Sequence, residues 1–224
     1  MNVFVISLGG SLVVPKEIDF DFLKKIKKLI EAEIKDKKFI IIVGGGRTAR
    51  NYQRVAKKLE NITNEDLDWL GIHATRLNAH LLLTIFRKNA YYRIIKNPRE
   101  KVNFKEKILI AAGWKPGFST DYDAVLLAKT YETNIIINLT NIDYVYDKDP
   151  NKHKDAKPFK EISWKNYLKL IDQKWIPGMS APFDPIASRL AKRLKFKVVI
   201  INGKKINNLR KFLENQKFDG TIIS

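Results

Sequence analysis

Apolar and amphipathic stretches alternate along most of the chain. Short aliphatic runs predict strands near 2–8, 39–43, 91–95, 107–113, 134–140, 197–203 and 220–224. Apolar residues spaced three and four apart predict helices near 20–35, 46–59, 66–88, 121–132, 184–194 and 205–214, and residues 140–160 look irregular. This alternation is typical of βαβ units, in which helices cover both faces of a mostly parallel sheet. No repeat or linker interrupts it, so one α/β domain over residues 1–224 is expected.

The longest predicted helix, at 66–88, carries one apolar stripe. Its apolar residues recur at spacings of three and four, at Leu67, Leu70, Ala74, Leu77 and Leu81. An apolar stripe of this kind is covered either by the core of its own domain or by another subunit. The sequence leaves both explanations open.

The chain has a large excess of positive charge. Its 224 residues include 42 Lys and Arg against 24 Asp and Glu, which gives a formal net charge of +18 and a pI near 9.9. Many lysines occupy the polar side of amphipathic patterns such as "FLKKIKKLIEAEIKDKK". We therefore interpret the excess mainly as a lysine-rich solvated surface. A dedicated nucleic-acid surface and a general attraction for small anions are the alternatives.

Several classes of protein are excluded by composition. The chain has no cysteine, which excludes disulfides, thiolate metal sites and a cysteine nucleophile. The opening "MNVFVISLGG" lacks a basic region and is interpreted as a first strand instead of a secretory signal. No stretch approaches the roughly 20 apolar residues that a membrane helix requires. A soluble cytoplasmic protein without membrane contact is expected.

Two glycine-rich turns follow predicted strands. "ISLGGSL" places Gly9, Gly10 and Ser11 after the first strand, and "IIIVGGGRTARNY" places three glycines, 44–46, after the second. Glycine lets a backbone approach a ligand closely, and the N–H groups at the start of a helix attract anions. Each turn alone is explained equally well as a plain turn without a ligand.

The second turn has the spacing of a dinucleotide fingerprint, with two glycines followed by Ala49. That fingerprint requires an acidic residue at the end of the next strand, but Asp66 and Asp68 stand at the start of a second helix. No G-K-[ST] closes either turn, which excludes a Walker loop. The two turns, with Arg47 and Arg50 nearby, therefore predict a cradle for a polyphosphate.

A third stretch, "GWKPGFSTDYDAVLLAK", leads into a predicted helix. Either Ser119 or Thr120 is suited to cap that helix, and Asp123, three residues after Thr120, would complete a capping box. Capping alone explains these residues. The functional alternative is that residues 117–120 offer N–H and hydroxyl donors to an anion at the helix start.

A fourth stretch, "NLTNIDYVYDKDP", combines three aspartates with two tyrosines. A calcium loop would need a glycine and a terminal glutamate that are absent here. Tyrosines beside a phosphate-binding edge are better suited to line a planar base. The histidines do not predict a metal site either, because the first two are seven residues apart and the third is in a loop, at His73, His80 and His153.

These segments together resemble the amino acid kinase superfamily and, within it, the uridylate (UMP) kinases of archaeal type. The similarity lies in "VGGGRTARNY", "DWLGIHATRLNAHLL", "PGFSTDYDAVLLA", "TNIDYVYDKDP" and "FDPIASRLA", and it extends to the terminal "GTII". It implies a three-layer αβα sandwich, with the nucleoside monophosphate mainly against residues 1–130 and ATP mainly against residues 131–224. It implies in-line transfer of the γ-phosphoryl group of ATP to UMP, with Mg²⁺ carried by ATP as the cofactor.

The resemblance also implies which residues form the site. The residues implied for ATP are Gly9, Gly10, Ser11, Gly45, Arg50, Thr140, Tyr146 and Asp149. The residues implied for UMP are Gly44, Asp68, Gly113, Trp114, Lys115, Pro116, Gly117, Phe118, Ser119 and Thr120. The expected catalytic residues are Asp184, Arg50 and Lys115, the last two as cations and Asp184 as a carboxylate near the reacting phosphates. No metal ion held by the protein alone is expected.

The chain also departs from the family pattern. Relatives usually read G-T-H-P-G-H-T-T-D in the loop where this chain has Trp114, Lys115 and Phe118 in place of Thr, His and the second His. Tyr144 replaces a glycine, and Ser7 stands where bacterial relatives carry a lysine. The alternatives are another kinase of the superfamily, acting on carbamate, isopentenyl phosphate or an amino acid, and a non-catalytic nucleotide-binding regulator or storage protein. Relatives form homohexamers, so a homo-oligomer is expected.

Overall fold

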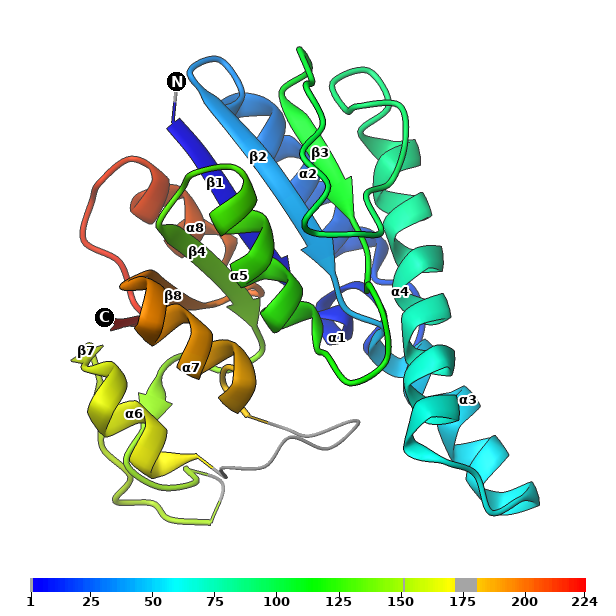
Figure 1. Ribbon diagram of the computed structural model, residues 1–224. Helices are drawn as coiled ribbons and strands as arrows, with labels where there is room; N and C mark the ends of the chain where they lie inside the picture. The colour runs from blue at the N-terminus through cyan, green and yellow to red at the C-terminus, as the bar shows by residue number, and fades with distance from the viewer. Residues whose placement is uncertain (1, 151, 172–180) are drawn as a thin grey trace.

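A seven-stranded sheet forms the centre of the computed structural model, which describes residues 2–150, 152–171 and 181–224 (Figure 1). The strand order is β3 (Ile108–Ala111), β2 (Lys37–Val43), β1 (Asn2–Leu8), β4 (Ile135–Thr140), β8 (Lys197–Asn202), β9 (Thr221–Ile223) and β7 (Glu161–Ile162). Neighbouring strands are parallel except β8 with β9, which are antiparallel. The expected mostly parallel sheet is confirmed.

Helices cover both faces of this sheet. Successive strand residues point to opposite faces, so Val5 and Ile40 join one hydrophobic cluster while Ile6 and Ile41 join the other. The first cluster packs against α5 (Thr120–Thr130), α6 (Trp164–Leu170) and α7 (Pro185–Leu194). The second packs against α2 (Phe20–Glu33), α4 (Asn64–Ile85) and α8 (Ile206–Leu213). The result is the three-layer αβα sandwich that the sequence predicts.

Some local predictions need correction. The strand expected near 91–95 is reduced to two isolated bridges, Ala90 with Ile108 and Ile95 with Ala111, because the chain touches the edge of the sheet only at these points. Five short elements were not predicted: α1 (Gly10–Val13), α6, β7, and the hairpin of β5 (Val145–Tyr146) with β6 (Pro158–Phe159). Their two to seven residues are too few to show a hydrophobic period.

The apolar stripe of α4 is partly buried in the core and partly exposed to solvent. Leu67 and Ala74 are buried, whereas 64% of Leu77 is exposed. Next to it, α3 (Gly46–Leu59) buries Ala49 as its single fully buried residue, and large apolar side chains on it stay exposed. Figure 1 shows α3 and the first turns of α4 projecting away from the sheet. Among the described residues, none of the helices combines the length and apolar character needed to cross a bilayer.

The loops at the carboxyl ends of β1, β2, β3 and β4 lie along one edge of the sheet. The register pairs Leu8 with Val43, so the turns after β1 and β2 begin side by side. A Cβ atom at Gly10 would overlap the backbone of Gly44 and Gly46, and Gly46 has a φ of +62°. Only glycine allows this close contact between two turns. Ligand sites in open α/β sheets lie at this edge.

Candidate active site

The two glycine turns are joined by backbone and side-chain hydrogen bonds. Gly44 N donates to Leu8 O over 3.0 Å, and the Asn78 amide of α4 donates to Gly44 O over 2.8 Å. Arg50 Nη1 lies 3.3 Å from Ser11 Oγ, so this guanidinium connects the second turn to the first. Burial, and secondly Arg47, lowers the pKa of Arg50, which nevertheless remains a cation at neutral pH. The turns therefore present a fixed positive group.

A cavity of about 370 Å³ and one of about 270 Å³ lie at this edge of the sheet. The smaller, named here the α4 cavity, is formed by the second glycine turn, α4 and the loop before α5. Its walls are Gly45, Gly46, Ala49, Arg50, Gln53, Asp68, Gly71, Ile72, Thr75, Gly113, Phe118, Ser119 and Thr120. Phe118, Ser119 and Thr120 bring the start of α5, with its free N–H groups, to the cavity wall.

The larger cavity, named here the β4 cavity, lies beyond the end of β4. Its lining includes Thr140, Tyr144, Tyr146 and Asp149. The rings of Tyr144 and Tyr146 meet edge to face at 6.3 Å, and the Tyr144 hydroxyl donates to Asp219 over 2.9 Å. Rigid aromatic walls with polar groups at their ends suit a planar ligand with a polar rim.

Loop 113–119 is tied to α4 at both of its ends. Gly113 N donates to Thr75 Oγ1 over 2.8 Å, and Gly117 N donates to Asp68 Oδ2 over 2.7 Å. Arg76 also reaches the loop, donating to Trp114 O over 3.4 Å. Burial raises the pKa of Asp68, although the Gly117 hydrogen bond opposes this. One oxygen of Asp68 thus holds the loop while the residue lines the α4 cavity.

The departures from the family pattern in this loop form a stack of rings. Phe118 stacks on Tyr122 at 4.5 Å and on Trp114 at 5.8 Å between ring centroids. Lys115 Nζ lies 4.4 Å from the centre of the Trp114 ring, and the Arg99 guanidinium lies 5.1 Å from the same ring. These rings and cations brace the loop against α5.

Buried carboxyl groups lie at the starts of α5 and α7. Asp121 accepts from Ser7 Oγ over 2.9 Å and from the Asp184 backbone N–H over 3.1 Å. Burial, and secondly the Asp184 charge, raises the pKa of Asp121 to about 7. Asp184 caps α7 by accepting from Ala187 N over 2.7 Å, and burial raises its pKa while hydrogen bonds from Ala187 and Ser119 oppose the rise. The pair borders the α4 cavity through Ser119.

The predicted capping box at the start of α5 is wrong. Ser119 alone caps the helix, accepting from Tyr122 N over 3.2 Å. Thr120 is the first helical residue, and the Asp123 carboxylate turns away from it to accept from Trp114 N over 3.0 Å. Asp123 is fully buried, and burial raises its pKa to about 7. The spacing of Thr120 and Asp123 matches a capping box, but the Asp123 carboxylate binds the backbone of Trp114 instead.

The predicted site residues are divided between the two cavities and the turns. Gly45, Arg50, Asp68, Gly113 and residues 118–120 line the α4 cavity. Thr140, Tyr146 and Asp149 line the β4 cavity. The remaining predicted residues line neither of these two cavities, namely Gly9, Gly10, Ser11, Gly44, Trp114, Lys115, Pro116, Gly117 and Asp184. Lys115 is exposed, and its Nζ lies over the rings of Trp114 and Phe118, the second of which lines the α4 cavity.

Several residues of the site were not predicted. Ile72 and Thr75 line the α4 cavity one and two turns after Asp68, and their spacing on the helix was a usable signal. Ser7 and Asp121 are 114 residues apart, so no local pattern brings them together. Their contact depends on the pairing of distant strands.

No metal cluster is found in the described part of the chain, where no three His, Cys, Asp or Glu side chains have a suitable arrangement. Asp143 accepts from Asn202 and pairs with Lys205, and Asp147 accepts from Lys157 N, so these carboxylates have protein partners. The three histidines are exposed, as the sequence analysis expected for the two on α4.

Comparison with known proteins gives consistent matches over nearly the whole chain. A family model described as the amino acid kinase family matches residues 2–202. The uridylate kinase of Thermoplasma volcanium is 37% identical over 215 residues, covering 95% of this chain and 93% of that protein. The uridylate kinase of Methanobrevibacter smithii is 33% identical, covering 98% of each. The crystal structure of uridylate kinase from Archaeoglobus fulgidus matches with a TM-score of 0.85 and 30% identity over all of both chains.

The raised pKa of Asp123 predicts that stability falls as the pH rises from 5 to 7. In this range the unfolded carboxyl, with a pKa near 3.8, has lost its proton, whereas the folded carboxyl, with a pKa of about 7, retains it. The free energy of unfolding therefore decreases by about 1.4 kcal/mol per pH unit for such a group. Asp123→Asn should show a smaller loss in urea titrations between pH 5 and 8.

Asp66→Asn is the matched control for this prediction. Asp66 is exposed, and its hydrogen bonds with Thr63 lower its pKa. Its contribution to the free energy of unfolding is therefore lost only as the pH falls towards that pKa, below the range tested. Equal pH profiles for native protein and Asp123→Asn would contradict the prediction.

Proposed function

The chain belongs to the amino acid kinase family, and we propose that it catalyses the ATP-dependent phosphorylation of UMP to UDP. The observation that carries this proposal is the α4 cavity, in which Asp68, Arg50 and the start of α5 face one small space. It lies at the same sheet edge as the aromatic β4 cavity, which suits a second nucleotide. Relatives named uridylate kinase match the chain over nearly its whole length.

We assign the acceptor nucleotide to the α4 cavity. One oxygen of Asp68 is bonded to Gly117 N, and the other is available to accept from a ribose hydroxyl. The acceptor phosphate suits the positive group of Arg50 and the donors at Ser119 and Thr120, where α5 begins. In this assignment loop 113–119, already held by α4 and α5, lies beside the sugar and base, with Phe118 in the cavity wall.

We assign ATP to the β4 cavity and the glycine turns. The tyrosine-lined walls suit the adenine ring, with Tyr146 and Asp149 near the base and ribose and Thr140 at the strand end. Residues 9–11 follow β1 and would cradle the phosphates, with Ser11 linked to Arg50. In this assignment Gly45 and Arg50 lie between the two substrates, since both line the α4 cavity.

Phosphoryl transfer between these sites requires little covalent chemistry from the protein. The transition state spreads negative charge over three oxygens, with attacking and leaving oxygens in line, so positioning and positive charge dominate. The acceptor phosphate is already ionised at neutral pH and needs no strong base. Arg50 and the glycine-turn N–H groups supply the positive groups, and Lys115 is a further proposed cation at the loop.

Mg²⁺ carried with ATP would neutralise part of the phosphate charge. Asp184 fits this ion, because a carboxylate oxygen is a hard ligand that Mg²⁺ prefers and its burial holds it in place. The same carboxylate would otherwise orient a cation beside the phosphates. Asp121 accepts a hydrogen bond from the Asp184 backbone N–H, which helps to fix Asp184 next to Ser119 in the wall of the α4 cavity.

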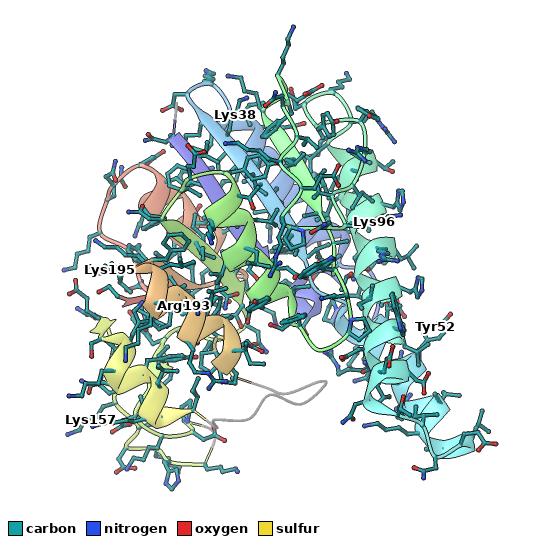
Figure 2. The ribbon with its side chains drawn as sticks, viewed as in Figure 1. Lys38, Tyr52, Lys96, Lys157, Arg193 and Lys195 are labelled. Atoms are coloured by element: carbon teal, nitrogen blue, oxygen red, sulfur yellow. The ribbon has the colours of Figure 1, made fainter. Side chains whose placement is uncertain are left out.

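A homo-oligomer is proposed from the exposed surface of α3. Tyr52, Val55 and Leu59 follow at helical spacing and are 64%, 52% and 75% exposed. Figure 2 shows Tyr52 pointing outward from this projecting pair of helices. An apolar surface of this kind is typical of a subunit contact. The proposal extends to the hexamer that the resemblance implies, and to a location in the cytoplasm.

The positive charge does not require a nucleic-acid partner. Figure 2 shows Lys38, Lys96 and Lys157 at separate places around the molecule, with Arg193 and Lys195 together at the end of α7. A dispersed arrangement suits solubility and attraction of anionic substrates more than a single binding stripe.

The function is tested by an acceptor panel. We expect ADP release with ATP, Mg²⁺ and UMP to exceed release with CMP, dTMP, GMP, carbamate or isopentenyl phosphate in a coupled assay. Higher turnover with another acceptor would show a different kinase of this family. No turnover, combined with a rise in melting temperature on adding ATP or UTP, would show a non-catalytic nucleotide-binding protein.

Asp68→Ala should weaken the acceptor site and spare the donor site. Loss of the carboxylate removes both the ribose acceptor and the Gly117 hydrogen bond, so KM for UMP should rise roughly tenfold or more. KM for ATP should change less than about twofold. Asp66→Ala, two residues earlier in the exposed Thr63 capping box, is the control and should leave both KM values unchanged. Equal KM values for Asp68→Ala and native protein would contradict the assignment.

The apolar surface of α3 predicts a second effect. A charge at its centre, Val55→Asp, should dissociate the oligomer into smaller species in light scattering coupled to gel filtration. Lys58→Asp changes the charge on the same helix at another exposed position and should retain the native mass. A native protein that is monomeric at micromolar concentration would contradict the proposed oligomer.

A further inference from the structure

Asp123 is a buried carboxyl group that neither caps α5 nor contributes apolar packing to it. The residue is 0% exposed and is followed by buried apolar residues, 124–128. The start of α5 is already capped by Ser119, so Asp123 is not needed there. Desolvating a carboxyl group is costly unless it is paired or hydrogen-bonded. The reason for the residue must lie outside the helix.

Among the described residues, the one hydrogen bond of the Asp123 carboxyl group goes to the start of loop 113–119. Its Oδ2 accepts from Trp114 N over 3.0 Å, and its Oδ1 has no hydrogen-bond partner in this part of the chain. Three other side chains anchor residues 113–117 by hydrogen bonds, and these side chains, Thr75, Arg76 and Asp68, belong to α4. On the α5 side, Ser119 joins the end of the loop to the helix as its cap, and Asp123 is the side chain that holds the start of the loop.

This anchor is reinforced by the ring stack. Tyr122, the neighbour of Asp123, stacks on Phe118, and Phe118 stacks on Trp114. The backbone of Trp114 is held by Asp123 while its ring is held by Phe118. The loop thus lies between α4 and α5, and both helices contribute to its position over the α4 cavity.

We propose that Asp123 is a positioning residue that fixes loop 113–119 for the acceptor nucleotide. The argument rests on the proposed function. Asp68 bonds Gly117 N with one oxygen, so the position of the loop and that of the acceptor carboxylate are linked. Loss of the Trp114 hydrogen bond would let Phe118 and Gly117 move together. Binding of the acceptor nucleotide would then have to order the loop, at a cost in binding free energy. The donor site lacks this dependence.

Two substitutions at Asp123 separate positioning from stability. Asp123→Leu removes the acceptor for Trp114 N at similar volume and should raise KM for UMP about tenfold, with KM for ATP changed less than about twofold. Asp123→Asn retains an oxygen that accepts from Trp114 N, so it should keep KM for UMP within about twofold of native. Rescue by Asn distinguishes the hydrogen bond from the mere presence of a side chain.

Thr130→Val is the matched control on the same helix. Thr130 Oγ1 donates to Pro98 O over 2.8 Å, so its loss also removes one contact from α5 to a distant loop, at the opposite end of the helix. It should lower the melting temperature and leave both KM values unchanged. If the leucine variant does not fold, Asp123→Ala is measured in its place, because alanine removes the hydrogen-bond acceptor without adding apolar atoms.

Amide hydrogen exchange tests the inference in the native protein. The Trp114 amide should exchange slowly in the absence of nucleotide, because its hydrogen bond is already formed. Fast exchange would overturn the inference, as would an unchanged KM for UMP in Asp123→Leu or an equal rise in both KM values. A native protein that does not phosphorylate UMP overturns the proposed function and this inference together, whereas an active native protein with an unaffected leucine variant overturns the inference alone.

Discussion

The close contact between the turns after β1 and β2 is the constraint on which the site depends. Gly10 has no room for a Cβ atom against Gly44 and Gly46, and Gly46 needs a positive φ. Because the two turns touch, α1 and α3 begin next to each other, and Arg50 of α3 reaches Ser11 of α1. A side chain at Gly10 would separate the turns and move this cation away from the neighbouring turn.

The sequence predicted the regular elements better than the contacts between them. The helix at 46–59 and the strands at 39–43 and 134–140 follow from strong periods and long apolar runs, and they recur within two residues as α3, β2 and β4. The glycine turns were predicted because they follow such strands, whereas the role of Asp68 was predicted from the family resemblance alone. Local reasoning failed at Asp123, whose spacing from Thr120 matched a capping box, because the carboxyl is bound by Trp114. The Ser7 to Asp121 contact depends on strand pairing that no local period encodes.

Three carboxyl groups near the starts of α5 and α7 reduce the stability of the fold, because each of them is desolvated. Desolvation raises the pKa values of Asp121, Asp123 and Asp184, so the fold loses stability wherever these groups must ionise. Each group also accepts hydrogen bonds that a buried apolar residue could not accept. Asp121 bonds Ser7 and the Asp184 N–H, Asp123 bonds the loop, and Asp184 caps α7. Such costs are common at functional sites, where geometry takes precedence over stability.

Helix α4 connects the site to the exposed apolar surface. Asn78 bonds the second glycine turn, Thr75 bonds Gly113, and Asp68 bonds Gly117, so one side of the helix holds both the turn and the loop. The first turns of the same helix pack against α3, whose apolar side chains are exposed, and Gln53 of α3 donates to Leu67 O over 2.8 Å. In the proposed oligomer, α4 would be held through α3 by a neighbouring subunit and directly by the substrate loops. Subunit contact would then reduce the motion of α4 and lower the entropic cost of ordering the acceptor site.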